Sequence, residues 1–288
     1  MSRVTGRFAP SPTGPLHFGS LVAAVASWLD ARSGGGRWLV RMEDVDTPRC
    51  VPGAAADILH TLERFGLTWD GEVIYQSARI DAYREALEKL RGIGAAYACS
   101  CSRKEAGEVY AGTCRAGVQQ PGRPLAWRVR VEDTPIAFAD RTYGRFSQNL
   151  ARDLGDFVVL RADGLFAYQL AVVVDDATQG ITDVVRGSDL LDSTPRQILL
   201  QRLLGYPTPH YLHVPLVTNE AGEKLSKQTL APPLIEGRED EDLRAALRFL
   251  NQPESPPGAD VLTWAIDKWD AARIKPRELP LCPDHKSA

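Results

Sequence analysis

The stretch RFAPSPTGPLHFGS, residues 7–20, decides the fold of this chain. It reads as a strand that stops at prolines, turns at Gly14-Pro15 and enters a helix through the segment HFGS. A strand, a tight turn and a helix start place unpaired backbone N–H groups where the helix dipole is positive. The stretch therefore predicts an anion site at the start of the helix.

Side chains in two distant segments add to this site. His17 supplies an imidazole that can donate to a phosphate oxygen, and Gly19, followed by Ser20, lets the backbone approach a ligand. Far along the chain, the segment EKLSKQ at residues 223–228 supplies Lys224 and Lys227 on a predicted loop. Two cationic clusters of this kind suit a nucleoside triphosphate that is held from both sides.

These motifs resemble those of class I aminoacyl-tRNA synthetases. HFGS is similar to the HIGH motif, KLSKQ is similar to the KMSKS motif, and RFAPSPTG resembles the opening of the glutamyl branch. Phe18 and Gln228 depart from the general motifs but spare the histidine, the glycine and the lysines. The alternative, a structural proline-rich turn and a solvated basic loop, explains each motif alone but not their combination. The resemblance implies ATP as a substrate, with Mg²⁺ carried on its phosphates.

Composition sets the class of protein. The chain has 288 residues, 44% of them hydrophobic and 25% charged, which is ordinary for a globular protein. The net charge of −3 gives no broad basic surface, so any RNA contact is expected to be local. The N-terminus lacks the apolar core of a secretory signal, and no apolar run approaches membrane-spanning length. We expect a cytoplasmic protein that does not contact membrane, and a monomer.

The order of predicted elements indicates an α/β fold. Helical spacing at residues 21–32, a buried strand at 37–46 and helices at 56–66 and 78–92 argue for a doubly wound, Rossmann-type parallel sheet. From about residue 95 the sequence pattern changes, which predicts an inserted α+β domain that bears zinc. The chain then ends in a short helical region. The expected division is 1–94, first half of the catalytic domain; 95–187, insertion; 188–230, second half; 231–288, helical C-terminal region.

Within the later part of the chain, three predictions are specific. Residues 157–176, apolar or alternating, predict strands with a hairpin turn at Ala162-Asp163-Gly164. Residues 193–205 predict a helix capped by Ser193 or Thr194, with Pro195 early and Gly205 after the end. Arginines that alternate along residues 125–131 predict a solvated strand face rather than an RNA stripe.

The cysteines cluster in a way that predicts a metal site. Cys99, Cys101 and Cys114 lie within sixteen positions, and three thiolates favour zinc in a closed tetrahedral site. From the residues alone the fourth ligand stays open between Tyr110, a water, Glu105 and Glu108, and three reduced cysteines without metal remain an alternative. The segment resembles the glutamyl-Q tRNA(Asp) synthetases, which implies Tyr110 as the fourth ligand of a structural Zn²⁺.

The glutamyl resemblance also implies an amino-acid pocket. Its glutamate-binding residues would be Arg7, Ala9, Ser11, Glu43, Tyr168 and Arg186. An arginine grips a carboxylate in bidentate fashion and stays charged, and Glu43 suits the ammonium group. Arg7 as a salt-bridged strand residue and Tyr168 as a core aromatic are the alternatives.

Other polar residues receive no catalytic role. The pairs Asp44/Asp46 and Asp175/Asp176 suggest a carboxylate dyad, but no partner pattern accompanies them. His210 and His213 flank Tyr211 and stay unassigned.

The combined resemblance implies a specific activity. The chain leaves no room after residue 230 for the helical region with which glutamyl-tRNA synthetases read the anticodon. We therefore expect tRNA-independent activation of L-glutamate by ATP, and its transfer to the queuosine base at the wobble position of tRNA(Asp). A conventional glutamyl-tRNA synthetase, a non-catalytic tRNA-binding paralogue and a ligase with a non-RNA acceptor are the alternatives.

Overall fold

Mostly parallel strands form the centre of the molecule. The computed structural model describes residues 3–218 and 232–277. One sheet has the order β1-β2-β3 and a second has the order β7-β6-β10-β9, and the described pairings in both are parallel except for the β6–β7 hairpin. The strands of these two sheets are β1 (Thr5–Phe8), β2 (Arg37–Met42), β3 (Ile74–Tyr75), β6 (Ile136–Asp140), β7 (Gly144–Gln148), β9 (Asp183–Gly187) and β10 (His210–Val214).

The two sheets meet at β1 and β9. The backbone N–H of Thr182 donates to the carbonyl of Thr5 at 3.0 Å, and Arg7 Nη1 reaches the carbonyl of Val185 at 3.4 Å. The carboxyl ends of β1, β2, β9 and β10 consequently open onto a common edge, where open α/β sheets bind ligands.

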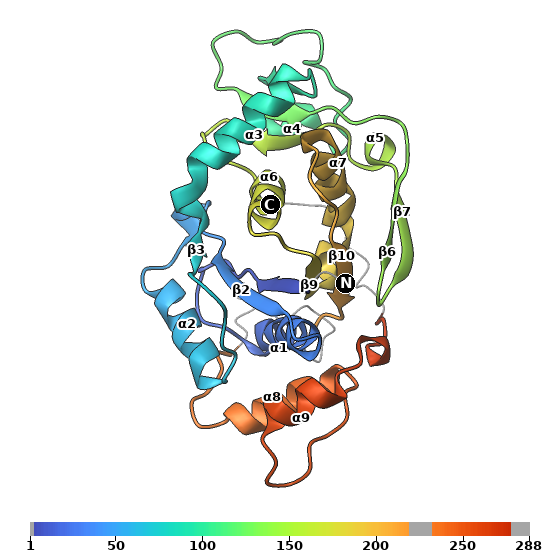
Figure 1. Ribbon diagram of the computed structural model, residues 1–288. Helices are drawn as coiled ribbons and strands as arrows, with labels where there is room; N and C mark the ends of the chain where they lie inside the picture. The colour runs from blue at the N-terminus through green and yellow to red at the C-terminus, as the bar shows by residue number, and fades with distance from the viewer. Residues whose placement is uncertain (1–2, 219–231, 278–288) are drawn as a thin grey trace.

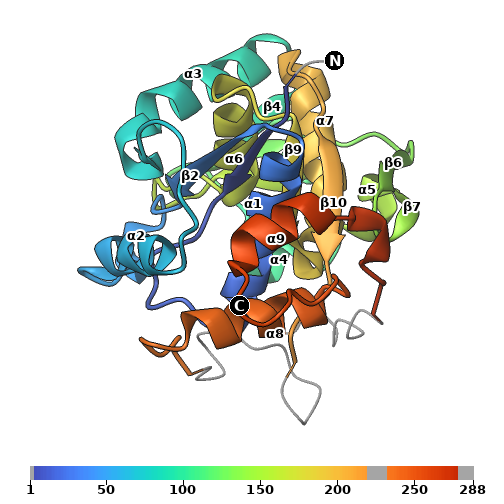
Figure 2. The ribbon, with the colours of Figure 1, turned by 60° about the horizontal axis from the view of Figure 1, so that its bottom comes forward.

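Helices cover both faces of this strand layer (Figures 1 and 2). One apolar cluster joins α1, α2, α8 and α9, and a second joins α3, α6 and α7. No helix in the described ranges has the length and apolar character that a bilayer crossing needs. The helices are α1 (Phe18–Ser33), α2 (Ala54–Arg64), α3 (Ile80–Gly92), α6 (Tyr168–Thr178), α7 (Thr194–Leu204), α8 (Glu239–Phe249) and α9 (Val261–Lys268), with 3₁₀ turns η1 (Thr47–Arg49), η2 (Gln76–Arg79), η3 (Ser188–Ser193) and η4 (Ala271–Arg273).

A small antiparallel sheet, β4-β5-β8, lies at one end of the molecule, at the top of Figure 1. Its parts are β4 (Ala96–Cys99), β5 (Ala126–Val129) and β8 (Phe157–Leu160), with the short helices α4 (Arg103–Ala106) and α5 (Leu150–Asp153). The parallel α/β architecture is thus as predicted. The division of the chain into two catalytic halves and an insertion stays a proposal. Strand β9, at the end of the expected insertion, lies parallel to β10 in the large strand layer.

One secondary-structure prediction was wrong. The turn at 162–164 is present, since Leu160 and Phe166 bridge across it, but residues 168–176 form helix α6 and no strand. Every residue from Gln169 to Asp176 is buried, so this helix shows no polar face in the sequence. A short apolar run rich in valine reads as a strand for that reason, because a buried helix and a buried strand share the pattern.

Candidate active site

A cavity of about 790 Å³ opens at the carboxyl ends of the central strands. The structure brings nine predicted site residues together in its lining: Arg7, Ala9, Ser11, His17, Gly19, Ser20, Glu43, Tyr168 and Arg186. They come from segments that are distant in sequence, namely β1 and the loop after it, the start of α1, the end of β2, the start of α6, and β9. Lys224 and Lys227 of the KLSKQ segment lie outside the described residues.

The loop after β1 is fixed by backbone hydrogen bonds to its neighbours. The N–H of Glu43 donates to the carbonyl of Pro10 at 2.9 Å, and the N–H of Val51 donates to the carbonyl of Pro12 at 2.9 Å. Gly14 has φ +142°, a value that other residues rarely adopt. The prolines and this glycine turn the chain from β1 into α1.

His17 is the N-cap of α1. Its Nδ1 accepts a hydrogen bond from the backbone N–H of Ser20 at 3.3 Å. In the neutral ring the proton then resides on Nε2, which is the donor predicted for a phosphate oxygen. The helix start and the imidazole therefore line the same cavity.

Gly19 has a role that the sequence did not suggest. A Cβ atom at this position would lie 3.1 Å from His17 Cε1 and 3.2 Å from its Nδ1. The absence of a side chain at residue 19 thus leaves room for the imidazole itself, in addition to any ligand.

Arg7 is buried and lines the cavity at the same time. Its Nε donates to Asp176 Oδ1 at 3.2 Å, and its side chain is 3% exposed. The same oxygen of Asp176 accepts from Arg41 Nη2 at 2.8 Å. Arg7 is therefore a salt-bridged strand residue and a pocket residue together, and the two readings of the sequence do not exclude each other.

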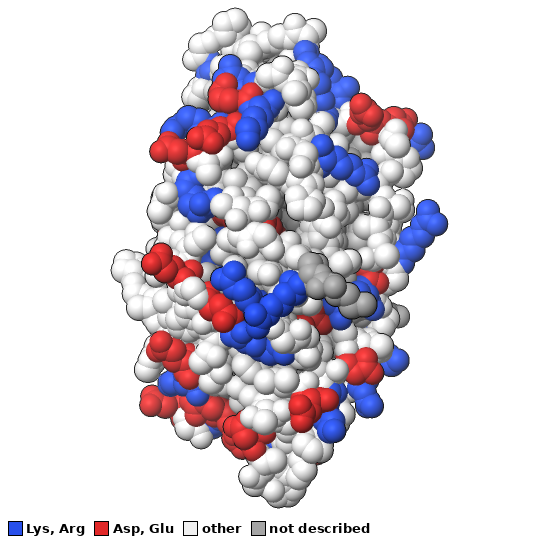
Figure 3. Space-filling model, in the orientation of Figure 1, with Lys and Arg blue, Asp and Glu red and all other residues white. Residues whose placement is uncertain are grey.

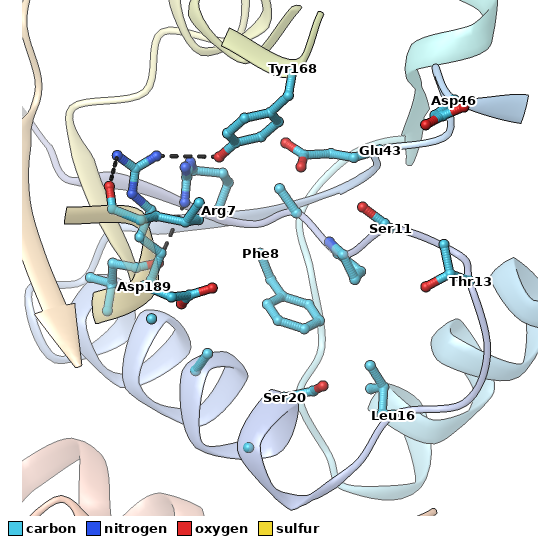
Figure 4. Close-up of a pocket in the computed structure, with 18 of the residues that line it drawn as sticks. Arg7, Phe8, Ser11, Thr13, Leu16, Ser20, Glu43, Asp46, Tyr168 and Asp189 are labelled. Atoms are coloured by element: carbon cyan, nitrogen blue, oxygen red, sulfur yellow. Dashed lines mark hydrogen bonds between the residues drawn. The ribbon is translucent and has the colours of Figure 1, made fainter. Parts of the chain in front are cut away.

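Glu43 is a buried acidic residue in the lining of the cavity. Its carboxylate lies 3.5 Å from Arg41 Nη2, and its Oε1 atom makes no hydrogen bond among the described residues. Burial raises the pKa of Glu43 to about 7, although the charges of Arg41 and Arg7 act in the opposite direction. Figure 4 shows this carboxylate turned toward Tyr168. A ligand cation placed here would supply the missing partner.

Tyr168 and Arg186 form the wall opposite the loop. Arg186 Nη1 donates to the hydroxyl oxygen of Tyr168 at 3.3 Å, drawn as a dashed line in Figure 4. Burial raises the pKa of Tyr168, and the neighbouring Arg186 opposes this shift. The guanidinium groups of Arg7 and Arg186 and the carboxylate of Glu43 thus line one part of the cavity, an arrangement suited to a zwitterion that carries a further acidic group.

The other acids near the cavity have structural partners, which agrees with the rejection of a carboxylate dyad. Asp44 accepts from the N–H and the hydroxyl of Ser77 at 2.8 and 2.6 Å. Asp175 accepts from Gln76 and Tyr83, both at 2.8 Å, and pairs with Arg79.

The predicted thiol cluster is assembled at the small sheet. The Sγ atoms of Cys99, Cys101 and Cys114 all lie within 4.8 Å of one another, and Cys101 and Cys114 are 3.6 Å apart. The hydroxyl oxygen of Tyr110 lies 3.2 Å from Cys99 Sγ and 3.5 Å from Cys101 Sγ. The edges of a tetrahedral zinc site are about 3.8 Å between two sulfurs and about 3.5 Å between sulfur and oxygen, so this donor set fits zinc.

Tyr110 and the cluster are held against the sheet by Arg128 and Gly155. The guanidinium of Arg128 lies 3.9 Å from the centre of the Tyr110 ring, and its Nε is 3.3 Å from Cys99 Sγ. Arg128 is buried, so the prediction of a solvated face for this strand was wrong. Gly155 has φ +76°, and a Cβ there would lie 2.1 Å from the carbonyl oxygen of Tyr110. The backbone contact between residues 110 and 155 hence requires glycine.

Comparisons with known proteins agree with this geometry. The family described as "tRNA synthetases class I (E and Q), catalytic domain" matches residues 3–251. The chain is 57% identical over 285 residues to the glutamyl-Q tRNA(Asp) synthetase of Neisseria meningitidis serogroup C (strain 053442), covering 94% of this chain and 97% of that protein. It is 60% identical over 285 residues to the protein of the same name from Thiobacillus denitrificans, covering 93% and 94%.

A solved structure is similar at the level of the fold and the sequence. The crystal structure of glutamate-tRNA synthetase from Elizabethkingia anophelis superposes with a TM-score of 0.78 at 27% identity. The match covers 95% of this chain and 67% of that chain.

Proposed function

The chain belongs to the glutamyl-Q tRNA(Asp) synthetase family of class I tRNA synthetases, and from this premise we propose that its cavity activates L-glutamate with ATP. The observation that carries the proposal is the convergence of Arg7, Arg186 and Glu43 beside the N-terminus of α1. Two cations and one anion match the two carboxylates and the ammonium of glutamate. The helix start with His17 matches a phosphate group.

In the proposed complex, Glu43 binds the ammonium group, and Arg7 and Arg186 bind carboxylates. Ala9, Ser11 and Tyr168 line the rest of the amino-acid site. Neutral glutamine would leave a buried cation without its partner, which favours glutamate. Asp176 contacts no proposed ligand atom, but it fixes the guanidinium of Arg7 and is itself bonded to Arg41.

The chemical step in this proposal is an in-line attack of the α-carboxylate on the α-phosphorus of ATP. The P–O bond to pyrophosphate breaks as the new P–O bond forms, and glutamyl-adenylate results. The protein has to orient the two reactants and stabilise the phosphate charge. We assign the entry side to His17, Gly19 and Ser20, and the departing pyrophosphate to Lys227 and Lys224, with Mg²⁺ carried on ATP.

The second substrate in the proposal is tRNA(Asp) that carries queuosine, whose base accepts the glutamyl group. Acidic and basic side chains are interspersed on the face shown in Figure 3, in keeping with a net charge of −3. RNA recognition is accordingly assigned to local contacts near the cavity mouth rather than to a broad basic surface. We place the protein in the cytoplasm, as a monomer.

We further propose a structural zinc at Cys99, Cys101, Cys114 and Tyr110. Three thiolates and a phenol oxygen would close the coordination sphere, so the ion has no open position for a substrate. Its contribution is to stabilise a loop-rich region that has a small apolar core of its own.

Labelled glutamate tests the proposed function directly. The protein is incubated with radiolabelled glutamate, ATP and tRNA(Asp), either with or without queuosine. We expect glutamate-dependent ATP–pyrophosphate exchange without any tRNA, and label only on the queuosine-containing RNA, at the modified base. Label on the 3′-terminal adenosine would indicate a conventional synthetase, exchange without RNA labelling a different acceptor, and absence of exchange a non-catalytic paralogue.

The lysine loop provides a second test. Lys227→Ala should lower the rate of exchange strongly while glutamate binding persists, because the substitution removes charge from the departing pyrophosphate. Equal exchange rates in Lys227→Ala and the parent would show that the pyrophosphate is held elsewhere.

A further inference from the structure

A buried hydrogen-bonded chain lies behind the cavity wall and ends at Arg186. It runs from Asp140 at the end of β6, through His213 on β10, to the guanidinium of Arg186 on β9. His213 is fully buried and does not line the cavity. The proposed mechanism leaves it without a role.

The geometry fixes which nitrogen of His213 carries the proton. Nδ1 lies 2.6 Å from Asp140 Oδ2, and a carboxylate accepts, so Nδ1 donates. Nε2 lies 3.1 Å from Arg186 Nε, which can only donate, so Nε2 accepts. Burial lowers the pKa of His213, with the charge of Arg186 acting in the same direction and those of Asp140 and Asp189 opposing it. A neutral ring with its proton on Nδ1 satisfies both neighbours.

Asp140 is itself held rigidly. Its Oδ1 accepts from the backbone N–H groups of Thr142 and Tyr143, both at 2.9 Å, in the turn between β6 and β7. Its Oδ2 accepts from the backbone N–H of His213 at 3.1 Å as well as from the ring. The β6–β7 hairpin therefore fixes the carboxylate that fixes the imidazole.

The remaining donors of Arg186 have other partners. Nη2 donates to Thr194 Oγ1 at 2.9 Å, and the Thr194 hydroxyl donates onward to the carbonyl of Leu190 at 3.2 Å. Nη1 reaches Tyr168, which lines the cavity. Because His213 accepts from Nε, the plane of the Arg186 guanidinium is fixed before a ligand binds. Preorganisation of this kind strengthens ligand binding.

We infer that His213, held by Asp140, is a positioning residue that orients the Arg186 guanidinium toward a carboxylate of the glutamate substrate. This inference rests on the proposed function, because it concerns the same amino-acid site. The required feature is an acceptor at the position of Nε2. A residue that merely fills the space would not supply one.

Two substitutions of His213 test the acceptor Nε2 and the donor Nδ1 separately. In His213→Gln the amide oxygen can reach the position of Nε2 and accept from Arg186. In His213→Asn the shorter amide can replace Nδ1 as donor to Asp140, but nothing replaces Nε2. His210→Asn is the control, because His210 lies on the same strand with its side chain 81% exposed.

The measurement is glutamate-dependent ATP–pyrophosphate exchange, with KM for glutamate, KM for ATP and kcat determined for each variant. We expect His213→Asn to raise KM for glutamate about tenfold or more, the size typical of a lost contact to a charged group. KM for ATP should stay within about twofold, and His213→Gln should retain most of the parent's KM for glutamate. The thermal midpoint, measured for both variants, reports any general loss of structure.

A third variant keeps the inference testable if His213→Asn fails to fold. In Asp140→Asn the backbone donors of Thr142 and Tyr143 hold the amide oxygen, so the amide N–H₂ faces Nδ1 of His213. The ring must then move its proton to Nε2, where it opposes Arg186 Nε. A change of tautomer of this kind impairs catalytic histidines elsewhere, and here it should raise KM for glutamate as His213→Asn does.

The outcomes are distinguishable. A parent protein without glutamate-dependent exchange would overturn the proposed function and this inference with it. An active parent in which His213→Asn and His213→Gln raise KM for glutamate equally, or raise both KM values together, would overturn the inference and leave the proposed function intact.

Discussion

The Oδ1 atom of Asp176 accepts a hydrogen bond from Arg7 Nε at 3.2 Å, inside the protein and at the wall of the cavity. The two residues lie on α6 and β1, and Arg41 donates to the same oxygen at 2.8 Å. One carboxylate consequently fixes two arginines. Arg41 has Glu43 and Asp175 as further acidic neighbours, at 3.5 and 3.8 Å, whereas Asp176 is the acidic partner that the described residues provide for Arg7.

Replacement of this carboxylate should affect stability and substrate binding together. Asp176→Asn keeps the size of the side chain and one acceptor but removes the charge. We expect the free energy of unfolding to fall by about 3 kcal/mol, because a buried arginine loses its counter-charge. KM for glutamate should rise, since the Arg7 guanidinium is no longer fixed. Chemical denaturation and exchange kinetics measure the two effects.

An exposed pair provides the control for Asp176. Asp133 pairs with Arg152 at 2.8 Å, with the two side chains 59% and 70% exposed. Asp133→Asn should leave the free energy of unfolding almost unchanged, because solvent screens an exposed ion pair. Similar losses from both substitutions would contradict the special role of the buried carboxylate.

Glu43 predicts a pH dependence of glutamate binding. Its pKa is raised to about 7, mainly by burial, and only the ionised form can pair with an ammonium group. The carboxylate is mostly ionised at pH 8 and mostly protonated at pH 6, so binding weakens as pH falls through 7. The apparent dissociation constant should rise about tenfold between pH 8 and pH 6, because it scales inversely with the ionised fraction.

Glu43→Gln isolates this effect. Glutamine cannot titrate, so the variant should bind glutamate weakly at both pH values, with a nearly flat profile. Isothermal titration calorimetry at pH 6, 7 and 8 measures both proteins. A parent whose affinity is constant over this range would show that Glu43 does not receive the ammonium group.

Local signals made much of this structure predictable. Helix α7 begins after Ser193, carries Pro195 in its first turn and ends at Gly205 with φ +73°, as predicted, although the Ser193 side chain makes no capping hydrogen bond. The loop from Arg7 to Ser20 and the thiol cluster were predicted for the same reason. Each of these features depends on a short run of residues whose chemistry is specific.

Buried polar partners could not be predicted in this way. Asp176 is 169 positions from Arg7, and His213 is 27 positions from Arg186 and 73 from Asp140. No spacing rule links such residues, since the fold alone brings them together. The β6–β7 hairpin, which holds Asp140, was likewise not predicted, and residues 168–176 were read as a strand because their helix is buried on all sides. The one feature of the sequence that distinguished this segment from a buried strand was the polar pair Asp175-Asp176 at the end of the apolar run.

Gly19 predicts opposite effects on stability and on activity. In Gly19→Ala the new Cβ lies 3.1 Å from His17 Cε1, so the imidazole must move, and its contact with the Ser20 N–H weakens. Alanine is a better helix former than glycine by about 1 kcal/mol, so the thermal midpoint should hold or rise. The kcat of exchange should fall about tenfold to hundredfold, as is typical for a displaced reacting group.

Gly92→Ala is the matched control for Gly19. Gly92 ends α3, and a Cβ there meets no atom within 4 Å, so exchange should be unchanged. If Gly19→Ala retains the kcat of the parent, the position of His17 is not limiting for the chemistry.

The thiol cluster predicts a zinc content that depends on particular side chains. Metal analysis of the purified protein should give about one zinc per chain. Cys101→Ser should lose the ion and lower the thermal midpoint, whereas Cys50→Ser, a cysteine outside the cluster, should change neither. Tyr110→Phe removes the phenol oxygen but keeps three thiolates, so zinc should remain with lower affinity while a water completes the tetrahedron.

The location of the cluster determines which activities survive loss of zinc. Cys99, Cys101 and Cys114 lie on and beside the small antiparallel sheet, and none of them lines the cavity. Chelation should therefore reduce the exchange reaction less than it reduces the stability of the small sheet, which hydrogen exchange of residues 96–99 and 126–129 would report. A protein without zinc, in which Cys101→Ser is as stable as the parent, would show that the cysteines are simply reduced thiols.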